Sequence, residues 1–154
     1  MYCIDTSSLI SAWRFDYPPD IFRSLWTQLD ELIKQNRIFS SLEVLLELKQ
    51  GGDAIYEWAN ARNHIFLEAD DKIQTAVSSI MDKYPSFIPE FSAHGIWADP
   101  YIIAMAHIKS LTVVTGEKAN GPGAKKPKIP NICQNLGIEC IDFLSLIRQE
   151  GWMF

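Results

Sequence analysis

Four acidic residues are spaced along the chain so that a sheet of parallel strands would bring them together. They are Asp5, Glu47, Asp99 and Glu117. Asp5 directly follows a short apolar run, which is typical of a buried strand, and Glu117 follows a second such run. Glu47 lies on a predicted helix and Asp99 at the start of another. In open α/β sheets ligands bind at the carboxyl ends of the strands, so we expect these four carboxylates at that edge.

Several carboxylates at one place need a counter-charge. Like charges raise one another's pKa, which makes an uncompensated cluster unfavourable. A divalent cation removes this conflict, and oxygen ligands without His or Cys suit Mg²⁺ or Mn²⁺ better than zinc. Such an ion can lower the pKa of a water and stabilise charge on a phosphodiester during in-line attack. The four acids therefore predict a Mg²⁺ or Mn²⁺ site for phosphodiester hydrolysis.

Each of these acids also has a purely structural interpretation. Asp5 could cap the helical turn that follows it, and Asp99, just before Pro100, could be an ordinary helix N-cap. Glu117 could be an exposed acid of a loop. One carboxylate can both cap a helix and bind a ligand, so both interpretations stay open for Asp5 and Asp99.

Two glutamates of the helix expected at residues 42–49 are candidates for the same role. Glu43 lies three residues after Ser40, which fits a capping box, so its carboxylate has a structural task. Glu47 lies among apolar neighbours, where a carboxylate needs a partner, and we predict it as the ligand with Glu43 beside it. The supporting candidates are three hydroxyl residues, Thr6, Ser7 and Thr115. They could equally satisfy the backbone of turns.

A basic loop at residues 116–128 follows the last of the four acids. It contains Lys118, Lys125, Lys126 and Lys128. Such a loop could hold nucleic-acid phosphates without reading bases, or it could simply be solvated. Five residues between positions 84 and 97 could stack on single-stranded bases or belong to the core: Tyr84, Phe87, Phe91, His94 and Trp97. The pattern assigns no metal-binding role to His94.

Strands and helices are expected to alternate along the whole chain. The expected strands lie at about 2–4, 37–40, 65–67, 112–115 and 138–141. The expected helices lie at about 9–13, 21–33, 42–49, 53–62, 71–84, 99–109, 129–137 and 143–149. This alternation predicts an α/β fold, with a parallel sheet between two layers of helices.

Composition narrows the class of protein further. A chain of 154 residues, 47% hydrophobic and 21% charged, is predicted to form one globular domain over residues 1–154. The net charge of −5 argues against broad non-specific binding of nucleic acid, but not against an enzyme with one local basic segment. The three cysteines form no CxxC pair and suggest reduced thiols. With no long apolar run and no signal peptide, we expect a cytoplasmic protein without a membrane partner.

The order of these motifs resembles that of PIN-domain ribonucleases. The resemblance rests on Tyr2-Cys3-Ile4-Asp5-Thr6-Ser7, Leu46-Glu47-Leu48, Ala98-Asp99-Pro100 and Val113-Val114-Thr115-Gly116-Glu117. The segments Leu48 to Ala59 and Lys128 to Cys133 are similar to one uncharacterised subfamily of PIN-like proteins. Asp5, Glu47 and Asp99 match the three main acids of PIN proteins, and Glu117 matches a fourth that is more often Asp.

The resemblance implies a fold, an activity and partners. The fold would be a three-layer α/β/α sandwich with a central parallel sheet of four or five strands. The activity would be Mg²⁺- or Mn²⁺-dependent cleavage of single-stranded or structured RNA, usually by the toxin of a type II toxin–antitoxin pair. Such toxins commonly form homodimers, and an antitoxin protein covers their active site.

Two other classes of protein compete with the nuclease. A PIN-like domain without catalysis could serve as a binding scaffold, although four intact acids argue against this. A phosphotransfer enzyme could use Asp5 as a nucleophile. Dehalogenase-like phosphatases have a second Asp two residues later, where this chain has Ser7, so that reading is disfavoured.

Overall fold

The computed structural model describes residues 1–89 and 95–154, and a parallel sheet lies at its centre. The sheet has five strands in the order β3-β2-β1-β4-β5. They are β1 (Tyr2–Ile4), β2 (Ile38–Ser41), β3 (Phe66–Leu67), β4 (Thr112–Val114) and β5 (Cys140–Ile141). All neighbouring strands are parallel, and Cys3 of the central strand lies opposite Phe39 and Val113. Their carboxyl ends therefore share one edge of the sheet, and Asp5 and Thr115, which follow β1 and β4, lie at this edge.

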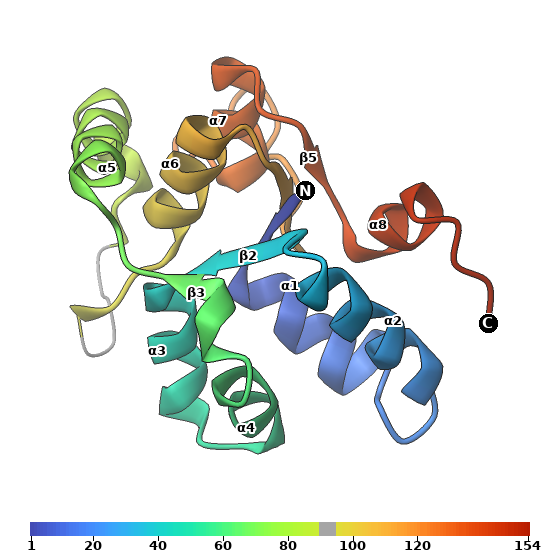
Figure 1. The fold of residues 1–154 in the computed structure, drawn as a ribbon. Helices are drawn as coiled ribbons and strands as arrows, with labels where there is room; N and C mark the ends of the chain where they lie inside the picture. Colours follow the sequence, from blue (N-terminus) through green and yellow to red (C-terminus); the bar gives the residue numbers. More distant parts are fainter. Residues whose placement is uncertain (90–94) are drawn as a thin grey trace.

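Helices cover both faces of this sheet (Figure 1). The α-helices are α1 (Thr6–Ser11), α2 (Arg23–Lys34), α3 (Leu42–Gly51), α4 (Ala54–Asn60), α5 (Asp71–Lys83), α6 (Asp99–Lys109), α7 (Ile129–Leu136) and α8 (Phe143–Gln149). A π-helical segment η1 (Ala12–Asp16) follows α1, and two 3₁₀ turns are η2 (Asn63–Ile65) and η3 (Pro85–Phe87). In Figure 1, α5, α6 and α7 lie on one side of the sheet and α1 to α4 on the other.

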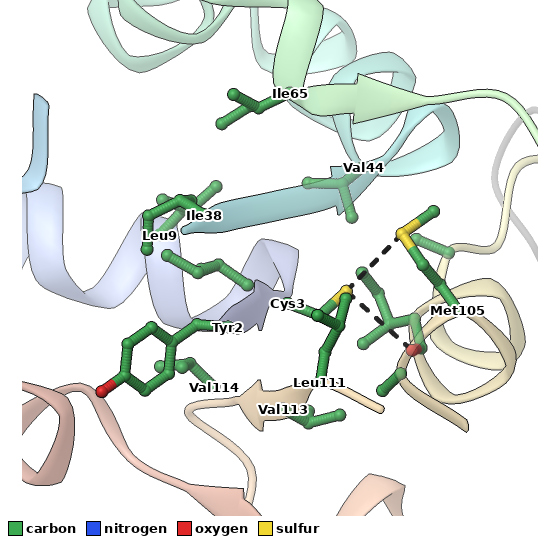
Figure 2. Close-up of a cluster of buried hydrophobic side chains, with 14 of the residues drawn as sticks. Tyr2, Cys3, Leu9, Ile38, Val44, Ile65, Met105, Leu111, Val113 and Val114 are labelled. Carbon is green, nitrogen blue, oxygen red and sulfur yellow. Dashed lines mark hydrogen bonds between the residues drawn. The ribbon is translucent and has the colours of Figure 1, made fainter. Parts of the chain in front are cut away.

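The core is built around β1 and α6. All three residues of β1 are buried, as expected for the central strand of a sheet that is covered on both faces. The Cys3 side chain points toward α6, where its sulfur lies 3.9 Å from that of Met105 (Figure 2). Six of the seven residues from Pro100 to Ala106 are buried, with Tyr101 the exception, so this part of α6 lies inside the protein. Its first turn consequently has a firm position at the sheet edge.

The helix starts show where the predicted boundaries were wrong. β2 continues through Ser41, whose hydroxyl caps α3, while Ser40 donates to the carbonyl of Ile4 at 2.6 Å. The predicted Ser40–Glu43 capping box is therefore not formed. By contrast, Asp70 caps α5 by accepting from the amide of Ile73 at 2.9 Å, so this helix begins at Asp71 as expected.

The predicted reduced thiols agree with the structure, and two of the helices end at glycines. Gly52 and Gly137 end α3 and α7 in the left-handed conformation, with φ of +57° and +69°. The three cysteines are free thiols: Cys3 and Cys133 are buried, and Cys140 is half-buried. Within residues 1–89 and 95–154, no helix is both long and apolar enough to span a bilayer. Phe91 and His94 lie outside the described residues.

Candidate active site

Asp5 is buried at the carboxyl end of β1. It is the N-cap of α1 and accepts from the amide of Ser8 at 2.8 Å, so its predicted capping role is real. Its other oxygen accepts from the hydroxyls of Ser7 at 2.8 Å and Thr115 at 2.7 Å. Burial raises its pKa to about 6, although these three hydrogen bonds favour the charged form. A carboxylate with only 3% exposure and no cationic partner is an unusual core residue.

The two hydroxyls beside Asp5 also organise the chain after β4. Ser7 Oγ accepts from the amide of Gly116 at 3.1 Å, and Thr115 Oγ1 accepts from the amide of Glu117 at 3.1 Å. A Cβ at position 116 would lie 3.3 Å from Ser7 Oγ, so glycine permits this close approach. Both predicted functions of the hydroxyls, support of the carboxylate and satisfaction of turn backbone, therefore occur together.

Glu47 connects the segments that carry Asp5 and Asp99. Its Oε2 accepts from the Thr6 hydroxyl at 2.6 Å, and its Oε1 accepts from the amide of Ala98 at 2.7 Å. Thr6 and Ala98 are the direct neighbours of the two aspartates in the sequence. The carboxylate of α3 thus lies between the start of α1 and the start of α6.

Glu43 lies one turn earlier on α3. Its Oε2 is buried and has no hydrogen-bond partner among the described residues. Burial raises its pKa, and the nearby charges of Glu47 and Glu68 raise it further. Glu43 is therefore a neighbour of Glu47, while Glu47 makes the contacts with the segments of Asp5 and Asp99.

Asp99 is the first residue of α6 and not its N-cap, which is Ala98. The ordinary capping role that competed with a functional role is therefore wrong. Its carboxylate is mostly buried, and Trp97 donates a side-chain hydrogen bond to it. Burial raises the pKa of Asp99 to about 7, and the charge of Glu117 raises it next, ahead of the two other acids.

Glu117 is half-buried and joins the acidic edge to α7. Its Oε2 accepts from the amide of Ile129 in the first turn of that helix, at 3.1 Å. The alternative that Glu117 is an exposed loop acid is wrong, because it has this backbone partner and interacts electrostatically with Asp99. Glu117 thereby fixes one end of the basic loop.

The four acids lie close enough to affect one another, yet their side chains do not converge. Within residues 1–89 and 95–154, no three Asp, Glu, His or Cys side chains form a group that could hold a metal ion. Both oxygens of Asp5 and both of Glu47 accept hydrogen bonds from protein groups. Repulsion between carboxylates that lack a cation favours such hydrogen bonds over convergence.

The donor chemistry of these residues nevertheless fits a hard divalent cation. Every candidate ligand is a carboxylate oxygen, which suits Mg²⁺ or Mn²⁺. In the described part of the chain, the four ion pairs between side chains involve other acids, so this buried negative charge has no basic partner. The raised pKa values of Asp5 and Asp99 express the same lack of compensation.

The sequence patterns did not indicate a role for Asn131. Its side chain joins the two ends of the segment 120–128 in the basic loop. Its Oδ1 accepts from the amides of Asn120 at 2.9 Å and Lys128 at 3.0 Å, and its Nδ2 donates to the carbonyl of Asn120 at 3.0 Å. The available signal was an amide side chain at the third position of a helix, where a capping box places Glu or Gln. The loop lysines Lys118, Lys125, Lys126 and Lys128 are all exposed.

Replacing Asn131 by Ala is expected to destabilise the protein by about 2 kcal/mol, because two partly buried hydrogen bonds and one exposed hydrogen bond are lost. Urea unfolding measures the loss, and hydrogen exchange should accelerate in residues 118–128. The matched control is Gln134→Ala, an exposed amide on the same helix, for which no change is expected. Equal stability of the two variants would show that the hydrogen bonds of Asn131 to the basic loop do not stabilise the protein.

Comparisons with known proteins define the fold class and the family of this chain. Five parallel strands between helical layers, with acids at the carboxyl edge, form a PIN-like α/β/α fold, which confirms the expected fold class. Residues 2–154 match the family DUF4411, a domain of unknown function, and the chain belongs to that family. A search of curated proteins found no match.

The shared fold is seen in several solved structures. A chain of VapBC2 from Rickettsia felis, bound to a DNA fragment from its promoter, matches with a TM-score of 0.56 at 17% identity over 92% of this chain and 98% of that one. FitAcB from Neisseria gonorrhoeae matches with a TM-score of 0.52 at 19% identity, over 92% and 96%. FitAB bound to an IR36 DNA fragment matches with 0.53 at 17%, over 92% and 94%. At these identities the likeness concerns the fold alone.

Proposed function

We propose that this chain is a divalent-metal-dependent endoribonuclease that acts as the toxin of a toxin–antitoxin pair. The observation that carries the proposal is the uncompensated charge at the sheet edge. Asp5 is a buried carboxylate and Asp99 a half-buried one; both have raised pKa values, interact electrostatically with the neighbouring acids and have no basic partner in the described part of the chain. A structural role alone gives no reason to gather four such groups.

Asp5, Glu47 and Asp99 would hold Mg²⁺ or Mn²⁺, and Glu117 would complete the set. Such an ion supplies Lewis-acid stabilisation of charge on a phosphodiester and lowers the pKa of water. The Ser7 and Thr115 hydroxyls keep Asp5 in place at 2.8 and 2.7 Å, and Thr6 orients Glu47 at 2.6 Å. The exposed lysines of the loop would contact RNA phosphates.

An antitoxin partner is part of the same proposal. The similarity in fold to chains of the VapBC2 and FitAB structures supports a paired protein, as does the resemblance to PIN-domain toxins. A homodimer in the cytoplasm follows from the resemblance in the same way. Co-expression with the product of an adjacent gene, followed by purification through a tag on this chain, tests for the partner.

RNA cleavage in Mn²⁺, Mg²⁺ or EDTA tests the activity directly. Purified chain, freed of any co-purified partner, should cleave single-stranded RNA with either ion and should not cleave it in EDTA. Asp5→Asn, prepared in the same way, should leave only background cleavage, which excludes a contaminating nuclease. Cleavage that persists in EDTA, or in the variant, would contradict the proposal.

A binding scaffold without catalysis is the second candidate function. It is favoured by one observation: the carboxylates of the described chain do not form a group that could hold a metal. Wild-type protein that binds its partner but cleaves no RNA with either ion would select this alternative.

A further inference from the structure

A polar groove of about 490 Å³ lies between the basic loop and the end of α5. From the helix side it is lined by Lys83 and Tyr84, and from the loop side by Asn120 and Lys126. Asn131 and Asn135 of α7 also line it. Its volume is typical of a ligand-binding cleft.

The charge of this groove is opposite to that of the protein. The chain has a net charge of −5, yet the described residues that line the groove include two lysines and no Asp or Glu. Lys83 and Lys126 come from segments far apart in the sequence and are both exposed. Two cations that face one groove without an acid favour a polyanionic ligand.

The four loop lysines are not equivalent in this respect. Lys118 lines a different hollow, together with Asp16 and Asp142, whose carboxylates weaken the attraction of that hollow for a phosphate. Lys126 alone of the four lines the groove with Lys83. Two of the loop lysines thus line different hollows, and the hollow without acids is the better polyanion site.

The groove also contains an aromatic ring in a fixed position. Asn135 Nδ2 donates to the Tyr84 hydroxyl at 3.2 Å, and the Lys83 ammonium lies 5.5 Å from the ring centre. A half-buried tyrosine beside lysines is a stacking platform for an unpaired base whose phosphates contact the cations.

The first turn of α7 contacts both the groove and the acidic edge. Asn131 lines the groove and clamps the loop, while Ile129, two residues earlier, donates to Glu117 at 3.1 Å. The same helix turn therefore places the groove beside the acids that would hold the scissile phosphate.

We propose that this groove binds the backbone of single-stranded RNA beside the cleavage site, with Lys83 and Lys126 on phosphates and Tyr84 under a base. This inference rests on the proposed ribonuclease function, because it names the path of that enzyme's substrate. The loop lysines alone do not define it, since Lys83, Tyr84 and Asn135 belong to other elements.

Binding can be measured apart from cleavage, by fluorescence anisotropy of labelled single-stranded RNA in EDTA. The double variant Lys83→Gln/Lys126→Gln should bind roughly 25-fold more weakly at 0.1 M salt, because each lost phosphate contact is worth a factor of about five through counterion release. The slope of log K against log salt should fall by about 1.4. Tyr84→Leu should weaken binding without changing that slope. Lys72→Gln/Lys109→Gln, an equal charge change at two exposed positions outside the groove, is the control.

The possible results separate this inference from the proposed function. If the wild type cleaves RNA and the double variant binds RNA normally, the groove is not the RNA-binding site, and the proposed ribonuclease function stands. If RNA binding depends on the two lysines but the wild type does not cleave RNA with either ion, the groove is an RNA-binding site and the proposed ribonuclease function is wrong. If an oligo-glutamate peptide binds in a manner that needs both lysines and RNA does not, the groove serves an acidic protein segment and the inference is wrong.

Discussion

The Asp99→Asn variant is expected to be more stable than the wild type and to have lost its RNA cleavage. Above pH 7 in metal-free buffer, the ionised Asp99 destabilises the fold, because its pKa is about 7 in the folded protein and near 3.8 otherwise. About three pKa units correspond to a gain on the order of 4 kcal/mol when the charge is removed. The asparagine oxygen can still accept the hydrogen bond from Trp97.

The same substitution removes a carboxylate from the proposed metal site. We expect the cleavage rate to fall on the order of a thousandfold, since a catalytic metal contributes several kcal/mol of transition-state stabilisation. Asp71→Asn is the matched control, because Asp71 is also the first residue of its helix but is exposed. It should keep both wild-type activity and wild-type stability to within about 1 kcal/mol. Lower stability of Asp99→Asn at pH 8 would show that the carboxylate has a partner that compensates its charge.

Much of this architecture could be predicted from local patterns. The short runs at 2–4 and 112–114, rich in residues that favour strands, indicate buried strands, and the stripe of Ile73, Val77 and Ile80 indicates the amphipathic helix α5. Alternation of the two kinds of element then predicts a parallel sheet, whose common edge gathers residues that follow strands. Asp5 and Glu117 could be identified on this basis.

Boundaries and contacts could not be predicted in the same way. Ser40 and Ser41, or Asp70 and Asp71, are adjacent and equally suited to cap a helix, so tertiary position decides between them. The hydrogen bonds of Glu47 join residues 41 and 51 positions apart, and no periodicity encodes such pairs. The clamp of Asn131 on the basic loop is of the same kind. Sequence patterns therefore indicated which residues share the edge, but not how their side chains are held.

A second large effect is expected in the pH dependence of stability. Asp5 and Asp99 have pKa values of about 6 and 7 in the fold, both above their value of 3.8 in the unfolded chain. Between pH 4 and 7 the folded state consequently binds more protons than the unfolded state, so the free energy of unfolding falls as pH rises. Ionisation of Asp5 costs on the order of 3 kcal/mol, and that of Asp99 on the order of 4 kcal/mol. Urea unfolding in EDTA at pH 5 and pH 8 should show a loss of several kcal/mol.

Divalent cations should reverse this loss, because an ion that binds only the folded state stabilises it by mass action and compensates the carboxylates. At pH 8, Mn²⁺ at 100 times its Kd should raise the free energy of unfolding by about 2.7 kcal/mol. At pH 5 the effect should be smaller, since both aspartates are then largely protonated. In Asp5→Asn/Asp99→Asn, both the pH dependence and the response to Mn²⁺ should largely disappear, whereas Asp71→Asn should retain them. A wild type whose stability at pH 8 is indifferent to Mn²⁺ and Mg²⁺ would contradict the metal site even if RNA cleavage had been observed, because the acids would then act without a cation.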